Sequence, residues 1–117
     1  MGNRYRAEVT FSAADVPYTL SYSWNAAASF EEASGKTLSA ALDELSRQEL
    51  SAISARALLW AGLREHHAGV SLERTGRLID ELGWKRVLEL MNHAFEYYFP
   101  KEEAAVAADP QTPAPST

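Results

Sequence analysis

The chain of 117 residues contains no cysteine. This absence excludes disulfide bonds, thiolate nucleophiles and cysteine-based zinc sites, and it is typical of a protein that stays inside the cell. The six glycines are scattered and form neither a phosphate-binding loop nor a dinucleotide fingerprint, and no G-x-S-x-G sequence occurs. We therefore expect no cofactor, no small-molecule substrate and no enzymatic activity.

Basic residues and long apolar runs are also scarce. Eleven Lys and Arg stand against sixteen Asp and Glu, which gives a net charge of −5 and a pI near 5.1. A nucleic-acid partner held through its phosphates normally shows as a basic stripe, which is missing here. No segment approaches the roughly 18 apolar residues of a membrane span, and the N-terminus has no apolar signal-peptide core. We expect a cytoplasmic protein that binds neither nucleic acid nor membranes.

Two N-terminal segments alternate polar and apolar residues with the period of two that is typical of a strand with one buried face. The apolar positions are Tyr5, Ala7, Val9 and Phe11 in the first segment and Tyr18, Leu20, Tyr22 and Trp24 in the second. Residues 12–17 between them are of turn-forming types. The pattern predicts an antiparallel hairpin with a short loop.

Capping residues and helical spacing predict five helices after the hairpin. They are expected at 26–34 with Asn25 as the cap, from Thr37 to about Ser46, from Ser46 or Ser51 to about His66, from Ser71 to Gly83, and from Trp84 to Pro100. The sequence thus predicts an α+β fold that is mostly helical. Residues 1–100 form one domain in this interpretation. Residues 101–117, which hold three of the five prolines, are predicted to be a disordered Pro/Ala-rich tail.

Two of these helices have pronounced apolar stripes. The expected core positions in the third helix are Ile53, Ala57, Trp60, Ala61 and either Leu63 or the stem of Arg64, with Leu58 and Leu59 widening the stripe. Those in the fifth are Trp84, Val87, Leu88, Met91, Phe95 and Tyr98. Gly69 is expected to stop the third helix. The apolar stripe of the third helix predicts that this helix is central to the fold.

The few residues that could carry metal or acid–base chemistry are badly spaced for it. His66 and His67 are adjacent, so on a helix they would point about 100° apart and could not bind one ion. We expect them to satisfy free carbonyls in the last turn of a helix. His93 has no second histidine at ligand spacing, and the acidic pairs at 31–32 and 80–81 are expected on solvated helix surfaces. The sequence therefore predicts no metal site and no catalytic residues.

The order of segments resembles a known family. A strand pair ends in YTLSYSWNAAASFEEASG, a short helix begins with TLSAALDEL, a long segment reads LSAISARALLWAGLREHHAGVSLERTGRLIDELG, and a last helix ends in AFEYYFP. This pattern resembles the phage tail assembly chaperones found in gene transfer agents, which are also labelled tail tube proteins. The resemblance covers residues 3–100, and its most specific stretches are 58–71 and 76–80. Much of it is a packing signature, in which Gly62 allows a close contact between helices.

The resemblance implies a non-enzymatic role in building a phage-type tail. Such chaperones are thought to coat the tape measure protein, to recruit major tail protein while the tube polymerises, and then to leave, so that they are absent from the mature particle. An alternative is a structural tail tube component that stays in the particle. A small helical regulator unrelated to phage is a third interpretation.

Partner-binding residues are predicted at two places. Tyr97, Tyr98 and Phe99 are consecutive, so they cannot all face inward, and at least one is expected to be exposed at an interface. Trp60 lies in the most specific stretch of the resemblance and is the other predicted contact. We also expect self-association, either through this aromatic end or through the hairpin edges, because an isolated two-stranded hairpin is marginally stable.

Overall fold

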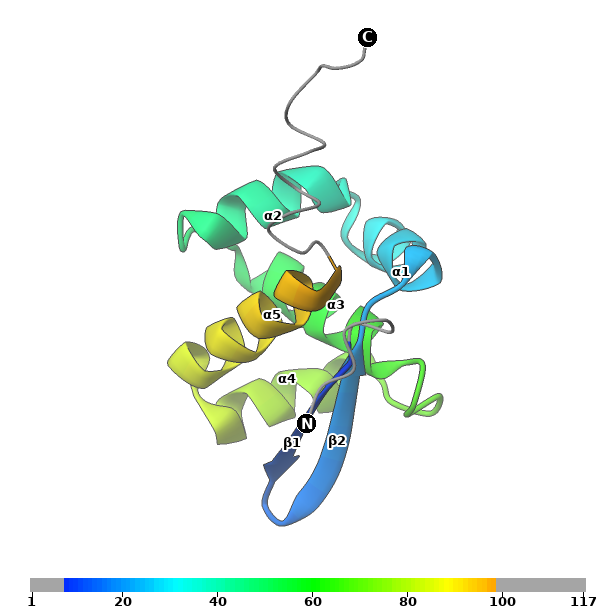
Figure 1. Ribbon diagram of the computed structural model, residues 1–117, viewed down its shortest axis with the longest axis vertical. Helices are drawn as coiled ribbons and strands as arrows, with labels where there is room; N and C mark the ends of the chain where they lie inside the picture. The colour runs from blue at the N-terminus through cyan, green and yellow to red at the C-terminus, as the bar shows by residue number, and fades with distance from the viewer. Residues whose placement is uncertain (1–7, 99–117) are drawn as a thin grey trace, which may run out of the picture.

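The computed structural model describes residues 8–98, and the predicted tail at 101–117 lies outside the described residues. It confirms the α+β fold, with a hairpin followed by five helices (Figure 1). The elements are β1 (Glu8–Ala13), β2 (Val16–Ser21), α1 (Trp24–Ser34), α2 (Leu38–Ser46), α3 (Ala52–Leu63), α4 (Leu72–Leu82) and α5 (Trp84–Tyr98). No helix within this range is long and apolar enough to cross a membrane.

The hairpin is tighter than the sequence predicted. β1 and β2 pair antiparallel up to Ala13 opposite Val16, so the loop is only Ala14 and Asp15 instead of residues 12–17. Both loop residues have positive φ, at 52° and 64°, as a two-residue turn that follows the strand twist requires. Asp tolerates this conformation better than Ala, whose β-carbon is strained there. The extra paired residues lengthen the apolar face, on which Val9, Phe11 and Leu20 are buried as predicted.

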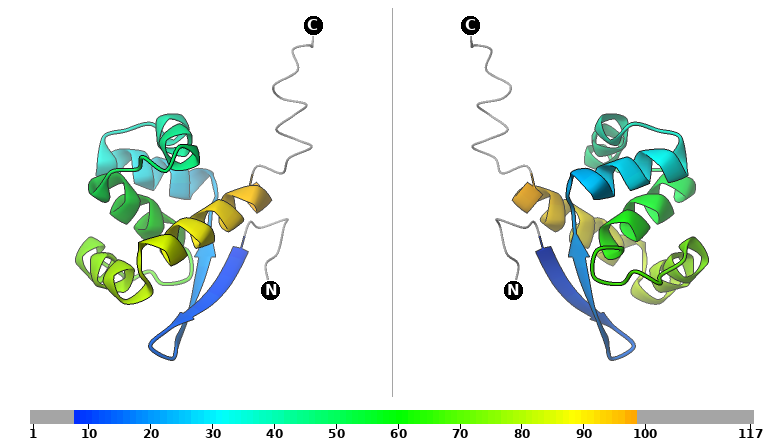
Figure 2. Two further views of the ribbon diagram at one scale, coloured as in Figure 1. Left: turned by 90° about the vertical axis from the view of Figure 1, so that its left-hand side faces the viewer. Right: turned by 90° about the vertical axis from the view of Figure 1, so that its right-hand side faces the viewer.

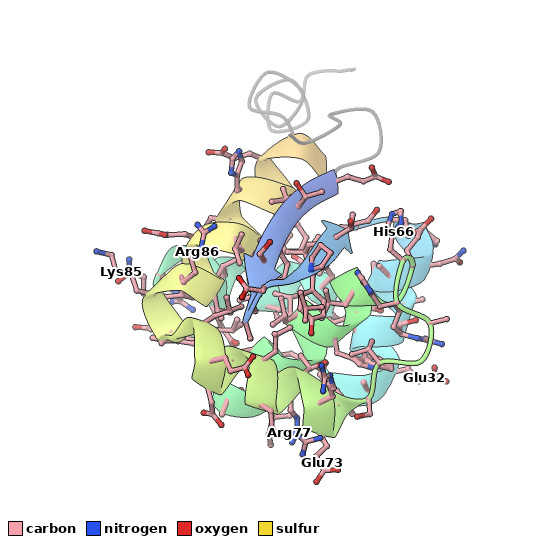
Figure 3. All side chains as sticks on the ribbon, turned by 90° about the horizontal axis from the view of Figure 1, so that it is seen from below. Glu32, His66, Glu73, Arg77, Lys85 and Arg86 are labelled. Carbon is pink, nitrogen blue, oxygen red and sulfur yellow. The ribbon has the colours of Figure 1, made fainter. Side chains whose placement is uncertain are left out.

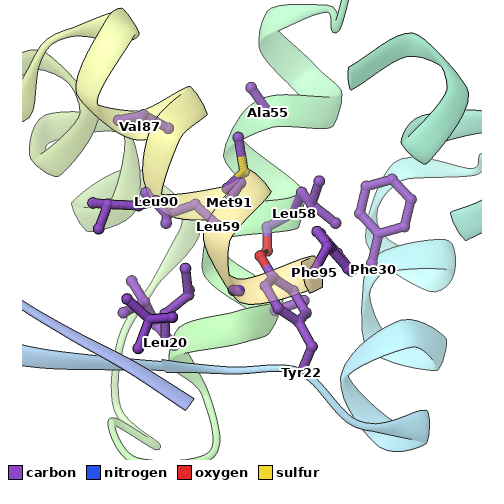
Figure 4. Close-up of a cluster of buried hydrophobic side chains, with 14 of the residues drawn as sticks. Leu20, Tyr22, Phe30, Ala55, Leu58, Leu59, Val87, Leu90, Met91 and Phe95 are labelled. Carbon is purple, nitrogen blue, oxygen red and sulfur yellow. Dashed lines mark hydrogen bonds between the residues drawn. The ribbon is translucent and has the colours of Figure 1, made fainter. Parts of the chain in front are cut away.

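The core lies where the hairpin, α1, α4 and α5 meet around α3 (Figures 1 and 2). Most of α3 is buried, which confirms its predicted central place. Phe30 from α1, Leu58 and Leu59 from α3 and Met91 from α5 are almost completely buried and face one another in this core (Figure 4). Charged side chains such as Glu73 and Arg77 point outward into solvent (Figure 3).

At Gly62, α3 approaches the hairpin closely. A β-carbon on Gly62 would lie 2.5 Å from Leu20 Cδ1 and 2.7 Å from Tyr22 Cζ. The sequence predicted a close contact of this helix at Gly62, and the neighbour is the end of β2 and the residue after it. The Tyr22 hydroxyl donates a 2.6 Å hydrogen bond to the carbonyl of Leu58, and its ring stacks on Phe95 at 4.2 Å (Figure 4). Burial raises the pKa of this phenol, so it remains a donor.

The N-caps of α2, α3 and α4 are among the predicted residues, whereas the N-cap of α1 is not. Ser23, and not Asn25, caps α1, because its hydroxyl accepts the N–H of Ala26 at 3.1 Å. The second strand therefore ends before Trp24, which becomes the first residue of α1. Of the two predicted caps for α3, Ser51 is the one used. That helix ends at Leu63, well before the predicted stop, since the following residues turn back towards the hairpin.

Burial corrects several predicted core positions. Ile53 is 63% exposed at the start of α3, and Trp84 is 42% exposed at the start of α5. Both occupy first turns that project beyond the packed part of their helices. Leu58 and Leu59 are buried as predicted, whereas the predicted stripes missed the buried positions Ser54 and Ala55 in α3 and Leu90 and Ala94 in α5.

Candidate protein-binding surface

An apolar groove of about 400 Å³ lies between α1 and α2. Its lining residues are Trp24, Ala27, Ala28 and Glu31 from α1 and Leu38, Ser39 and Leu42 from α2. Most of this lining is hydrocarbon, and one carboxylate is present. The two helices form one end of the molecule, on the side away from the hairpin turn (Figure 1). The groove is thus a surface on which a partner can pack without disturbing the core.

The spacing along α1 explains one wall of the groove. Its four lining residues follow one another at intervals of three, one and three, which places them on one helical face. Ala27 and Ala28 are small, so this face stays hollow between the larger side chains. Phe30 points to the other side and is fully buried in the core. Burial of Phe30 therefore holds α1 in place while the groove face remains open.

The second wall depends on how α2 is held against α1. The Glu31 carboxylate accepts the backbone N–H of Leu38 at 2.9 Å, which occupies one of the free donors at the start of α2. Thr37 caps the same helix, as predicted. Ala41 and Leu45 are buried beneath α2, whereas Leu38 and Leu42 are only partly buried. The apolar side chains of α2 are therefore divided between the core and the groove.

Trp24 is 82% exposed at the edge of the groove. An indole contributes a large apolar area to an interface, and tryptophan is enriched among the residues that dominate binding energy. The sequence placed Trp24 on the buried face of a strand, which the structure contradicts. The signal that could have located it is Ser23 as a helix cap, because the helical face of 24, 27, 28 and 31 follows from that start.

Trp60, one of the predicted contact residues, makes contacts within the fold. Its indole N–H donates to the carbonyl of Val70 at 3.1 Å, which ties the loop after α3 back to that helix. The guanidinium of Arg64 lies 4.9 Å from the centre of its ring. Trp60 is half-buried and does not line the groove. A partner contact at Trp60 stays a prediction.

The aromatic end at 97–99 was the other predicted contact. The backbone of Tyr97 and Tyr98 belongs to the last turn of α5. Their side chains, and the whole of Phe99, lie outside what the structure describes. A partner contact at this end stays a prediction.

His66 and His67 bind the hairpin, and not the helix end as predicted. His66 Nε2 lies 3.0 Å from a carboxylate oxygen of Glu8. The backbone N–H of Thr19 donates to His67 Nε2 at 3.0 Å. Burial lowers the pKa of His67, and the neighbouring His66 lowers it further, so the ring is held in the neutral form that can accept this bond.

The contact of His67 also affects whether the edge of β2 can pair with a second copy. The N–H of Thr19 points away from β1, since it is bonded to His67. Pro17, two residues earlier on the same edge of β2, has no N–H to offer. A second copy could therefore pair with this edge only by displacing His67. Self-association remains a prediction, and β2 is the less suitable edge for it.

Titratable groups elsewhere do not converge. Within residues 8–98, no three His, Asp or Glu side chains are grouped closely enough to hold a metal ion. Glu31 and Glu32 are exposed on α1, and Asp80 and Glu81 are exposed on α4. Their position fits the predicted solvated surfaces.

The comparisons with known proteins found no relatives. No protein-family model matches the chain. No curated protein and no solved structure is significantly similar to it. The resemblance to tail assembly chaperones is carried by the sequence segments at 58–71 and 76–80.

Proposed function

We propose that this protein is a non-enzymatic tail assembly chaperone, which binds tape measure protein and major tail protein while a phage-type tail tube is built. The observation that carries the proposal is the apolar groove between α1 and α2, with Trp24 exposed beside it. Leu38 and Leu42 pack against the core and remain only partly buried, so part of their apolar surface stays open to a partner. The sequence resemblance at 58–71 and 76–80 supplies the class of partner.

A groove of this kind suits a chaperone for helical proteins. An amphipathic helix can place its apolar face between two helices, and such recognition needs anchors only at every third or fourth residue. The two walls are short, with 11 residues in α1 and 9 in α2. A contact over so short a length buries little area, and small interfaces are typical of transient complexes. Reversible binding is what a protein that leaves after assembly requires.

Co-expression with a tape measure protein tests the proposal. We expect the tape measure protein to stay soluble and to co-purify with this chain, whereas it should aggregate when expressed alone. A long helical coiled-coil protein unrelated to phage tails serves as the control for general stickiness. The proposal is wrong if the tape measure protein remains insoluble and unbound while this chain is folded.

Mass spectrometry of purified particles separates the chaperone from a structural tube component. A chaperone should be nearly absent from the particle, whereas a tube subunit would be present in many copies. The described residues contain one sheet of two strands, which offers little of the strand pairing between subunits that a tube needs. We therefore rank the structural role second.

A further inference from the structure

The charges around the α1–α2 groove are unevenly neutralised. Lys36 forms an ion pair with Glu44 at 2.9 Å, and Arg47, just after α2, pairs with Asp43 at 2.9 Å. These two cations are the basic residues of the segment 24–47. Its other two carboxylates, at 31 and 32, have no ion-pair partner within the described part of the chain. The groove therefore has an apolar lining beside two carboxylates that no cation neutralises within residues 8–98.

One of these carboxylates lies in the groove, and the other lies beside it on α1. Glu31 lines it directly, and its hydrogen bond to the N–H of Leu38 holds the carboxylate at the junction of the two helices. Glu32 is the next residue of α1, and its side chain extends into solvent (Figure 3). Carboxylates beside an apolar surface favour a partner that presents lysine or arginine next to its own apolar residues.

Trp24 strengthens this preference. Its exposed ring lies on the same face of α1 as Glu31, seven residues away along the helix. A second lysine or arginine of the partner can lie over the exposed indole, where the ring quadrupole attracts cations. The aromatic ring and the carboxylates thus favour the same partner chemistry.

A second copy of this chain fits the groove poorly. Two copies packed face to face through their grooves would bring four unpaired carboxylates together, which is unfavourable at an interface. The whole chain has a net charge of −5, so approach of two copies is also disfavoured over longer distances. A basic partner gains from the same charges.

We propose that the α1–α2 groove binds an amphipathic helix whose apolar stripe is flanked by lysine or arginine residues. Trp24, Leu38 and Leu42 contact the stripe, and the carboxylates of Glu31 and Glu32 attract the flanking cations. This inference rests on the proposed function, because it names the surface and the partner chemistry that such a chaperone would use.

A pair of designed peptides tests the inference on the full chain. Each has about 15–20 residues, enough for an isolated helix, with leucines at helical spacing, and it carries flanking lysines in one peptide and glutamates in the other. Fluorescence anisotropy of the labelled peptides measures binding at low and high salt. We expect the lysine peptide to bind, the glutamate peptide to bind at least tenfold more weakly, and added salt to reduce this difference.

Variants place the binding in the groove. Trp24→Ala should weaken binding of the lysine peptide at least tenfold, as expected for a dominant interface residue. Ala28→Gln should weaken it as well, because the longer side chain fills the groove from an exposed position without a change of charge. Glu32→Lys should remove most of the preference for the lysine peptide. Ile53→Ala is the matched control, since Ile53 is an exposed apolar residue that does not line the groove, and its affinity should be unchanged.

Four results would overturn the inference. In the peptide assay, these are equal binding of the two peptides, no binding of either peptide, and an equal loss of affinity in Ile53→Ala and Trp24→Ala. In sedimentation, it is a dimer of the wild-type chain that Trp24→Ala dissociates. The last result would identify a second copy as the occupant. If Trp24→Ala still solubilises the tape measure protein, the groove inference fails but the proposed function stands. If the lysine peptide binds as expected and the tape measure protein does not, the proposed function fails and the groove inference stands.

Discussion

Replacing Gly62 by alanine is the sharpest test of how α3 packs on the hairpin. The new β-carbon would lie 2.5 Å from Leu20 Cδ1, 2.7 Å from Tyr22 Cζ and 2.9 Å from the Tyr22 hydroxyl oxygen. Neither side chain can yield easily. Leu20 is fully buried, while the Tyr22 ring is stacked on Phe95 and its hydroxyl is bonded to α3. The substitution therefore overpacks the core.

Two effects of Gly62→Ala lower the free energy of unfolding, and one effect raises it. Overpacking a core costs about 1–3 kcal/mol, and contacts this short place Gly62→Ala near the upper value. Displacement of the Tyr22 hydroxyl from its acceptor costs about 1 kcal/mol more. Alanine in place of glycine in a helix gains up to about 1 kcal/mol. We expect the free energy of unfolding to fall by about 2–3 kcal/mol.

Urea unfolding followed by circular dichroism measures this change. Gly76→Ala is the matched control, because Gly76 lies inside α4 and its added β-carbon would meet only Arg56 Cδ, at an ordinary 3.5 Å. We expect the free energy of unfolding of Gly76→Ala to equal that of the wild type or to exceed it by up to about 1 kcal/mol. Adding Tyr22→Phe to Gly62→Ala should cost less than Tyr22→Phe costs alone, since the hydroxyl clash is removed. The reasoning is refuted if Gly62→Ala is as stable as the wild type.

Three further predictions concern single contacts. Ser23→Ala should lower the free energy of unfolding by about 1 kcal/mol in urea titrations through loss of the α1 cap, whereas Asn25→Ala should leave it unchanged; equal effects would contradict the cap assignment. His67→Gln keeps an acceptor that cannot be protonated. Because His67 has a lowered pKa in the folded protein, the unfolded chain binds the proton first as the pH falls. The free energy of unfolding of the wild type, relative to this variant, should therefore fall as the pH drops below about 6.5. A difference that does not change with pH would count against the contact. Trp60→Phe removes the bond to Val70 and should cost about 1 kcal/mol by thermal or urea unfolding, without weakening peptide binding in the groove.

The predicted elements depended on local patterns, and most of them were confirmed. Alternation with period two identified Val9, Phe11 and Leu20 as a buried strand face, because a strand exposes its two sides in turn. Thr37 and Ser71 were correctly predicted as caps. In each case the hydroxyl accepts the backbone N–H three residues later, which is a local interaction. Such interactions span only a few residues, so the sequence alone determines them.

The candidate site was not predictable in the same way. The sequence contains Trp24, Leu38 and Leu42 as apolar residues at regular spacing, and regular spacing indicates only that they share a face with their neighbours. Whether that face is covered depends on which other helix packs on it, which spacing within one helix cannot show. The same limit explains why Ile53 was expected in the core and is exposed.

The sequence by itself determined the α+β class, the order of the elements, the central place of α3 and the absence of cysteine chemistry. Only the tertiary structure decided which residue meets which. It placed Gly62 against the hairpin, turned His66 and His67 towards the strands, and left the α1–α2 groove open beside Trp24. The physical reason is that capping and periodicity act within about one or two turns, whereas these contacts join segments roughly 40 or more residues apart or depend on a surface that no segment covers.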